Sequence, residues 1–114
     1  MIDGCTFGTM TIEGKTYNSD LKIFPDHRVA DNWWRASGHL LTPEDIADLV
    51  AAGPEILIVG TGVYGRMIID SGTSNLLAQK GIELVAEPTE KAARKFNEFI
   101  TRKSNVAACF HLTC

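Results

Sequence analysis

The chain has 114 residues, a formal net charge of −3 at pH 7, and 45% hydrophobic against 22% charged residues. This length fits a single domain, residues 1–114, with one core, and the composition excludes the disordered and collagen-like classes. Lys and Arg are scattered along an acidic chain, which argues against nucleic acid as a partner.

The N-terminal residues and the cysteines favour a cytoplasmic protein. The stretch 1–14 contains an early acid and several glycines instead of the apolar segment of a signal peptide. No run approaches the roughly 18 apolar residues that span a membrane, so a membrane is not an expected partner. Cys5, Cys109 and Cys114 are odd in number and form no C-x-x-C pair, which predicts reduced thiols.

The first half of the chain predicts a β-hairpin followed by a helix. Two partly alternating stretches in residues 6–24 flank Glu13-Gly14-Lys15, the pattern of two strands joined by a turn. Residues 29–35 are expected to form another short extended stretch. Thr42-Pro43-Glu44-Asp45 combines an N-cap, a proline at the first helical position and an acid three residues after the cap, so a helix should cover 43–52.

The second half predicts strands that alternate with helices. Strands are expected at 55–59, 82–86 and 106–112, because each of these is a short run of mostly apolar residues. Helices are expected at 73–80 and from Pro88 onward. A β-α-β-α-β order of this kind lays its strands parallel in one sheet. The fold class is therefore α/β, with the hairpin added at the N-terminus.

The stretch 56–66, ILIVGTGVYGR, carries three glycines in the G-x-G-x-x-G spacing of dinucleotide-binding turns. The turn follows a predicted strand, and Glu87 lies where a ribose-binding carboxylate is expected. A dinucleotide turn must lead directly into a long helix, however, and Asp70-Ser71-Gly72 interrupts any helix here. We interpret the glycines as a tight structural turn and predict no cofactor. A phosphate or nucleotide site near Arg66 is the alternative.

The carboxyl ends of the predicted parallel strands are where a small molecule would bind. These ends are residues 60–66, 87–89 and 111–114. The candidate ligand-binding residues at these ends are Gly62, Tyr64, Arg66, Glu87, Thr89 and His111.

The C-terminal residues suggest metal binding or nucleophilic catalysis, and neither is well supported. Cys109 and His111 would share one face of a strand, but the paired spacings typical of zinc are absent, so no metal site is predicted. Cys114 with His111, oriented by Glu87, would form a nucleophile pair, but no motif of a cysteine enzyme surrounds it, so no catalytic residue is assigned. The alternative is that Cys109 and Phe110 pack on the two faces of a buried strand.

Trp33, Trp34 and Arg35 place two indoles and a guanidinium in succession. Tryptophan and arginine are enriched in binding hot spots, so these three are candidate residues of a partner surface. Alternation in an extended stretch should bury one tryptophan and expose the other. Ordinary core packing with a stacked arginine is the alternative.

Several segments together resemble one known family. They are Trp34-Arg35 with Gly38-His39, the strand and turn Ile58-Val59-Gly60-Thr61-Gly62, Thr89-Glu90 with Ala92-Ala93 and Phe96-Asn97, and the ending Phe110-His111-Leu112-Thr113-Cys114. Over nearly its whole length the chain resembles the adipogenesis-associated domain family, formerly a domain of unknown function, to which the mitochondrial respiratory complex I assembly factor is related. The resemblance implies a three-layer α/β domain with a mixed central sheet and a supporting N-terminal hairpin. It implies no reaction, cofactor or catalytic residue.

Two functional hypotheses follow. The first is a non-enzymatic cytoplasmic protein that acts through protein partners in regulation or assembly, because no complete catalytic set is present and Trp33, Trp34 and Arg35 offer a contact surface. The second is a protein that binds a small ligand, an anion or a nucleotide at the carboxyl ends of the parallel strands, in one version as an enzyme.

Overall fold

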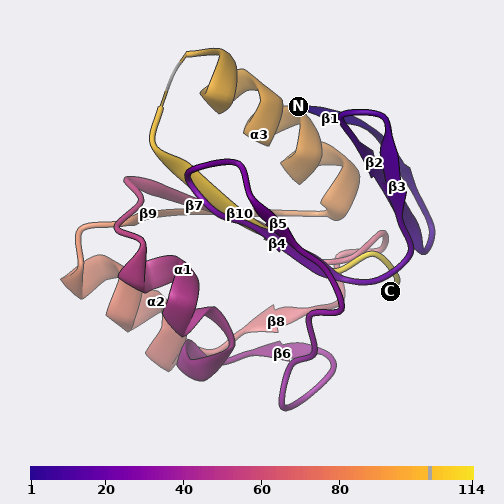
Figure 1. Cartoon of the computed structure of the whole chain (residues 1–114). Coiled ribbons are helices and arrows are strands. Elements are labelled where there is room, and N and C mark those ends of the chain that lie inside the picture. Colours follow the sequence, from indigo (N-terminus) through magenta and orange to yellow (C-terminus); the bar gives the residue numbers. More distant parts are fainter. Residues whose placement is uncertain (103) are drawn as a thin grey trace.

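The computed structural model describes residues 1–102 and 104–114 (Figure 1). The N-terminal sheet consists of β1 (Ile2–Thr6), β2 (Thr9–Ile12) and β3 (Lys15–Tyr17). The central sheet consists of β4 (Leu21–Ile23), β5 (Val29–Ala30), β7 (Ile56–Gly60), β9 (Glu83–Glu87) and β10 (Val106–Phe110). The remaining elements are the strand pair β6 (Leu40–Leu41) and β8 (Ile68–Ile69), the 3-10 helix η1 (Pro43–Ile46), and the helices α1 (Ala47–Ala51), α2 (Ser71–Gln79) and α3 (Thr89–Thr101).

The central sheet has the strand order β5-β4-β10-β7-β9 and is mixed. Strands β10, β7 and β9 are parallel, which confirms the β-α-β-α-β reading of the second half. Strand β4 pairs antiparallel with β10, and this pairing ends at Leu21 opposite Phe110. The register therefore brings the residue before β4, Asp20, beside the residue after β10, His111.

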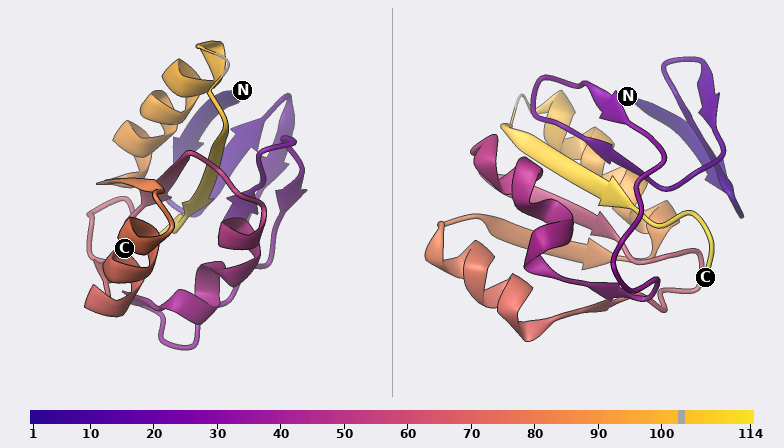
Figure 2. Two further views of the ribbon diagram at one scale, coloured as in Figure 1. Left: turned by 90° about the vertical axis from the view of Figure 1, so that its left-hand side faces the viewer. Right: turned by 60° about the horizontal axis from the view of Figure 1, so that its bottom comes forward.

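Both faces of the central sheet are covered, which gives the three layers expected of the α/β class (Figures 1 and 2). Helix α3 and the N-terminal sheet pack on one face around Phe96 and Phe110. Helices α1 and α2 cover the other face around Leu49, Leu77 and Cys109. The prediction that Cys109 and Phe110 pack on opposite faces is thus confirmed. Burial raises the pKa of Cys109 to about 12, so this thiol stays protonated.

The N-terminal region differs from its prediction in extent. Strands β2 and β3 form the predicted hairpin around Glu13 and Gly14, but β1 adds a third antiparallel strand through its pairing with β2. Gly4 and a register shift near it break the alternation that would have indicated β1. The expected stretch 29–35 is a strand only at Val29–Ala30.

Three further boundaries depart from the predictions. The helix expected over 43–52 is one 3-10 turn, η1, followed by the short α1. Helix α2 begins at Ser71 because the Asp70 side chain accepts a hydrogen bond from the Gly72 N–H and caps the helix. The last strand ends at Phe110, two residues before its predicted end at Leu112. Across the described residues, none of the helices is both long and apolar enough to cross a membrane.

Candidate functional site

The glycine turn uses its own main-chain N–H groups for internal hydrogen bonds. The N–H groups of Val63 and Arg66 donate to the main-chain oxygens of Thr113 and Cys114, over 2.7 and 3.2 Å. The Gly62 N–H donates to Thr89 Oγ1 over 2.9 Å. The other N–H groups from Thr61 to Met67 also donate within the molecule, to Glu87, Cys114, Gly62 and Thr61. An anion cradle needs N–H groups that converge on a ligand, and this turn directs them at the C-terminal segment, at Thr89 and Glu87, and at its own carbonyls instead.

Gly62 is required by that packing. Its φ is +110°, and a Cβ there would lie 2.7 Å from the Cys114 carbonyl oxygen and 2.8 Å from that of Thr113. The turn leads into β8, and α2 begins only at Ser71. The chain therefore does not pass from the turn directly into a helix, as the sequence indicated.

The six candidate ligand-binding residues reach the same edge of the sheet but do not converge on one cavity. Thr89 is buried and joins two of them, since its Oγ1 accepts from Gly62 and donates to the His111 carbonyl over 2.6 Å. Tyr64 and Arg66 are exposed, with the Arg66 guanidinium 5.9 Å from the Tyr64 ring. Of the six, only His111 lines the cavity at this edge.

The Glu87 carboxylate forms ion pairs with two lysines of α3. The carboxylate lies 2.6 Å from Lys95 Nζ and 3.7 Å from Lys91 Nζ. The hydrogen bond from Lys95, aided by the charge of Lys91, keeps the pKa of Glu87 below its ordinary value. This carboxylate is therefore engaged with α3 and is not directed toward His111 or Cys114 in a catalytic arrangement.

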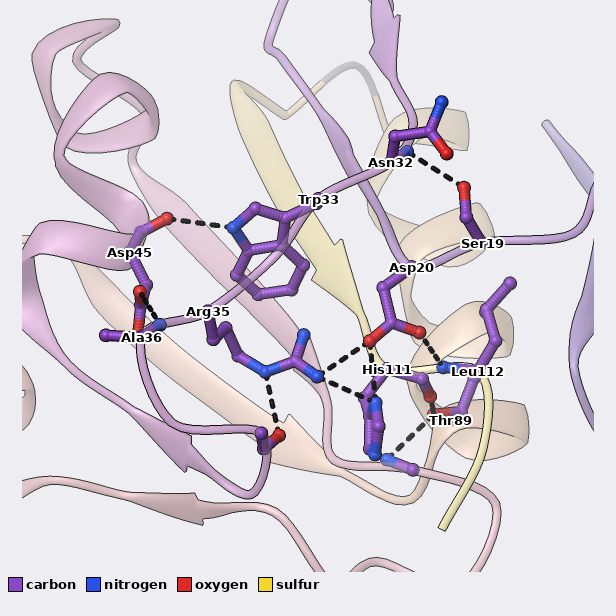
Figure 3. Close-up of polar contacts among 12 residues, drawn as sticks. Ser19, Asp20, Asn32, Trp33, Arg35, Ala36, Asp45, Thr89, His111 and Leu112 are labelled. Carbon is purple, nitrogen blue, oxygen red and sulfur yellow. Dashed lines mark hydrogen bonds and ion pairs between the residues drawn. The ribbon is translucent and has the colours of Figure 1, made fainter.

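A buried cluster of Asp20, Arg35 and His111 lies beside the turn (Figure 3). Asp20 Oδ2 accepts a hydrogen bond from Arg35 Nη2 over 2.7 Å. The same oxygen lies 2.7 Å from His111 Nδ1. Asp20 Oδ1 accepts from the Leu112 N–H over 2.7 Å. The side chains of Asp20, Arg35 and His111 are 12%, 5% and 7% exposed. The cluster ties the start of β4, the 31–39 segment and the end of β10 together.

The hydrogen bonds fix the charge state of Asp20. Burial by itself raises the pKa of Asp20, but the hydrogen bonds from His111, from the Leu112 amide and from Arg35 together outweigh burial and lower it. Asp20 is therefore an ionised carboxylate, and an ionised carboxylate only accepts hydrogen bonds. His111 Nδ1 also lies 3.0 Å from Arg35 Nη2, but its shorter contact with the ionised Asp20 requires the ring proton on Nδ1, which leaves Nε2 as the ring nitrogen without a partner.

Arg35 reaches this cluster because its neighbours are fixed on η1. The Trp33 indole is buried and donates to the Asp45 carbonyl over 3.1 Å, and the Ala36 N–H donates to Asp45 Oδ1 over 3.2 Å. The Arg35 Nε donates to the Gly38 carbonyl over 3.0 Å. The guanidinium also stacks on Trp33, 4.8 Å from its ring centroid. These contacts orient Arg35 toward Asp20.

A cavity of about 320 Å³ opens beside the cluster. Its lining includes Asp20, Arg35 and His111 together with Ser19, Trp34 and His39. The exposed His39 ring packs edge-on against His111, with 5.7 Å between ring centroids. Two buried polar atoms of the cluster, Arg35 Nη1 and His111 Nε2, have no hydrogen-bond partner among the described residues. Buried polar atoms are ordinarily paired, so these two nitrogens are unsatisfied groups that a further partner could pair.

The three candidate residues of a partner surface, Trp33, Trp34 and Arg35, differ in their exposure to solvent. Trp33 and the Arg35 side chain are buried, each 5% exposed, because one packs in the core and the other pairs with Asp20. Trp34 is 80% exposed. Only Trp34 of the three thus offers its side chain to a partner, and the prediction that one tryptophan is buried and the other exposed is confirmed.

Sequence reasoning did not single out Asp20. It lies 15 residues from Arg35 and 91 from His111 along the chain, so no local motif contains the cluster. In the structure Asp20 directly precedes β4 and His111 directly follows β10, whereas the sequence placed His111 inside a strand at 106–112. Only the register between β4 and β10 brings the two together.

Metal ligands are not gathered at this edge. Within residues 1–102 and 104–114, no group of three or more His, Cys, Asp and Glu side chains is arranged to hold a metal ion. His39 and His111 are neighbours, but two imidazoles alone do not complete a zinc site.

A family model described as a protein of unknown function (DUF498/DUF598) matches residues 2–111. The chain belongs to this family. The DUF498/DUF598 assignment agrees with solved structures of similar fold. The conserved hypothetical protein PH1505 from Pyrococcus horikoshii OT3 is 27% identical, with a TM-score of 0.87 over 100% of this chain and 99% of the other. The protein MT938 is 27% identical, with a TM-score of 0.85 over 100% and 98% of the two chains.

A more distant structure shares the fold alone. A Bordetella pertussis protein described as a Mth938-like domain is 18% identical, with a TM-score of 0.71 over 98% of this chain and 85% of the other. The DUF498/DUF598 family therefore defines the fold of this protein, and the chemistry of the site has to be argued from its own residues.

Proposed function

We propose that this protein acts without catalysis, by binding a protein partner in a regulatory or assembly role in the cytoplasm. The observation that carries the proposal is a group of large exposed side chains around the C-terminal segment 111–114. We call the group the carboxyl-edge surface, because it borders the carboxyl ends of the parallel strands; it consists of Phe7, Trp34, Tyr64, Arg66 and Ile68.

The members of the carboxyl-edge surface are strongly exposed. Trp34, Tyr64, Ile68 and Phe7 are 80%, 69%, 66% and 56% exposed. Single exposed apolar residues are ordinary on any protein, whereas several at one edge are typical of an interaction site. Tryptophan, tyrosine and arginine are also the residue types that contribute most to binding free energy at interfaces.

Contacts with the C-terminal segment and with one another hold these side chains at one edge. The Phe7 and Tyr64 rings lie 6.2 Å apart. The Gly8 N–H, next to Phe7, donates to the Leu112 carbonyl over 2.7 Å. The Ile68 N–H donates to the carbonyl of His39, which lines the same cavity as Trp34. A partner with an apolar segment and an acidic group would complement these rings and the Arg66 charge.

Crosslinking from a defined position tests the proposal. A photoreactive phenylalanine derivative at position 34 should capture one protein from cells that make this chain. The same derivative at Gln79 is the matched control, because Gln79 is exposed at the end of α2, before the amino end of β9. A Tyr64→Ala change should lower the yield from position 34 at least about tenfold, as loss of an interface hot spot does.

Three outcomes would contradict the proposal. Equal capture from positions 34 and 79 would mean that the carboxyl-edge surface has no preferred partner. Unchanged capture in the Tyr64→Ala variant would mean that the other side chains of this surface do not contribute. Crosslinks only between two copies of this chain would replace a separate partner by self-association.

The adipogenesis-associated branch of the family is part of this proposal. Its support is the order of short segments that ends in Phe110-His111-Leu112-Thr113-Cys114. In the structure this ending forms the last residue of β10 and the C-terminal segment that the carboxyl-edge surface surrounds. Of the residues that carry the resemblance, Trp34 belongs to the carboxyl-edge surface, and the ending 110–114 lies next to it.

A further inference from the structure

The cavity beside Asp20, Arg35 and His111 has the position and the chemistry of a ligand site. It lies where β10 ends, and ligands of open α/β sheets bind at the carboxyl ends of parallel strands. Its volume of about 320 Å³ is that of a site for a small metabolite. This position is independent of the glycine turn, whose N–H groups are already used.

The unpartnered nitrogens at the cavity offer hydrogen bonds to one anion. Asp20, Arg35 and His39 are the charged or titratable side chains that line the cavity with His111 in the described part of the chain. Ionised Asp20 and Arg35 neutralise one another, and Asp20 already accepts three hydrogen bonds. Two nitrogens of the cluster have no partner among the described residues: Arg35 Nη1, which can only donate, and His111 Nε2, which donates once the ring carries a second proton.

We propose that this cavity binds a small organic anion, a carboxylate or a phosphate monoester, whose oxygen accepts a hydrogen bond from His111 Nε2. The apolar part of the ligand lies against Trp34. Nδ1 of His111 already donates to Asp20, so donation from Nε2 requires a second ring proton. His111 therefore takes up one proton from solvent when the anion binds; with a carboxylate the charges of Asp20, Arg35, His111 and the ligand then sum to zero, and with a phosphate dianion to −1.

A purely structural role explains only half of the cluster. Joining Asp20 to the Leu112 amide and to Arg35 fixes three segments, and this needs Nδ1 of His111 but not Nε2. A buried nitrogen without a partner carries a free-energy penalty that a purely structural cluster has no reason to keep. The exposed His39 ring is the group that packs next to His111 and would have to turn aside.

The test is calorimetric titration of the whole chain with benzoate, phenyl phosphate and benzamide. Benzoate carries a carboxylate, phenyl phosphate carries a phosphate, and benzamide is a neutral analogue of the same size. Each titration is done near pH 7.5 in two buffers of different ionisation enthalpy, neither of which carries an oxyanion. At least one anion should bind at or below about 10 mM, at least about tenfold more tightly than benzamide, with proton uptake of up to one per anion.

The variant His111→Asn isolates the proposed group. An asparagine amide placed where Nδ1 stands can still donate to Asp20, but nothing replaces Nε2. This variant should lose the proton uptake and bind the anion at least about tenfold more weakly. His27→Asn is the matched control, because His27 is exposed, has a φ of +73° that asparagine tolerates, and does not line the cavity.

The outcomes separate as follows. Binding of benzoate alone or phenyl phosphate alone supports the proposal and assigns the carboxylate or the phosphate. No binding of either anion, equal binding of benzamide, or undiminished proton uptake in His111→Asn overturns it. If His111→Asn does not fold, the NMR chemical shifts of the His111 ring nitrogens are measured in the unmodified chain instead. Anion binding should convert Nε2 to its protonated form. An unchanged Nε2 chemical shift would contradict the proposal. None of these readouts depends on the partner proposed above.

Discussion

The glycine turn at 60–66 and the Asp20–Arg35–His111 cluster lie at the same edge of the sheet and differ in how their polar groups are satisfied. The turn has the spacing of a ligand-binding motif, yet its N–H groups bond to neighbouring main chain and to Thr89. The cluster has no motif, yet two of its buried nitrogens have no partner among the described residues. The glycine spacing therefore indicates backbone geometry here, whereas the unpartnered buried nitrogens indicate hydrogen bonds that a ligand could make.

Removal of the Asp20 carboxylate should have the largest effect. Asp20→Ala leaves the Arg35 guanidinium buried without its counter-charge and frees the Leu112 N–H. Loss of one partner of a buried ion pair lowers the free energy of unfolding by about 4 kcal/mol. Urea denaturation measures this change. The control is Asp48→Ala, whose ion pair with Lys22 is half-exposed at Asp48 and should contribute about 0.5 kcal/mol. Similar losses in both variants would mean that the cluster is not a buried ion pair in solution.

The turn should be sensitive to a single methyl group at Gly62. A Cβ there meets the Cys114 carbonyl oxygen at 2.7 Å, at a φ of +110°. We expect Gly62→Ala to lower the free energy of unfolding by about 3 kcal/mol, because strain and displacement of the C-terminal segment add.

Gly14→Ala separates strain from close packing. Gly14 also has a positive φ, +79°, but a Cβ there meets nothing within 4 Å. Gly14→Ala should therefore lower the free energy of unfolding by about 1 kcal/mol, which is the cost of the backbone strain alone. Equal losses at Gly14 and Gly62 would refute the claim that the C-terminal segment fills the turn.

Thr89 links the two regions, so its hydroxyl should have an intermediate effect. Thr89→Val keeps the shape of the side chain but leaves the Gly62 N–H and the His111 carbonyl without this partner. Two buried main-chain groups left unpaired should lower the free energy of unfolding by about 2 kcal/mol. Thr11→Val removes an exposed hydroxyl pair with Thr16 and should change it by less than about 0.5 kcal/mol. A negligible loss for Thr89→Val would show that the link is dispensable.

Protonation of Asp20 at low pH should have the smallest of these effects on the free energy of unfolding. The folded pKa of Asp20 is lowered, so its contribution is fully present above the unfolded value of about 3.9 and is lost as the pH falls through the folded pKa. The unfolding free energies of the unmodified chain and of Asp20→Asn should therefore converge as the pH is lowered from about 5 to 2. A difference that stays constant over this range would contradict the lowered pKa.

Much of the fold could be predicted from local patterns. The apolar runs of β7, β9 and β10 identified the strands of the β-α-β-α-β half, because burial on both faces leaves a local pattern. Strand β1 was not predicted, because Gly4 and the irregular pairing near it interrupt the alternation of apolar and polar residues. The glycine turn could be interpreted as structural because the residues after it cannot continue a helix.

The cluster could not be predicted in the same way. Asp20, Arg35 and His111 meet because Leu21 pairs with Phe110 and because Trp33 is fixed on η1. Both are long-range contacts that no short window contains. Arg35 was noticed in the sequence as a surface residue beside the tryptophans, and its burial follows from the Asp20 partner that the sequence did not reveal.

The most direct test of the difference between the two regions is an amide NMR titration of the unmodified chain with benzoate, phenyl phosphate and NAD. Our account predicts the largest shifts at Ser19, Asp20, His39 and Leu112 with at least one of the two small anions, smaller shifts at Thr61 to Met67 with these anions, and no shifts at Thr61 to Met67 with NAD. Shifts concentrated at Gly62 to Arg66, with NAD or phenyl phosphate, would contradict it and would restore the glycine turn as the ligand site.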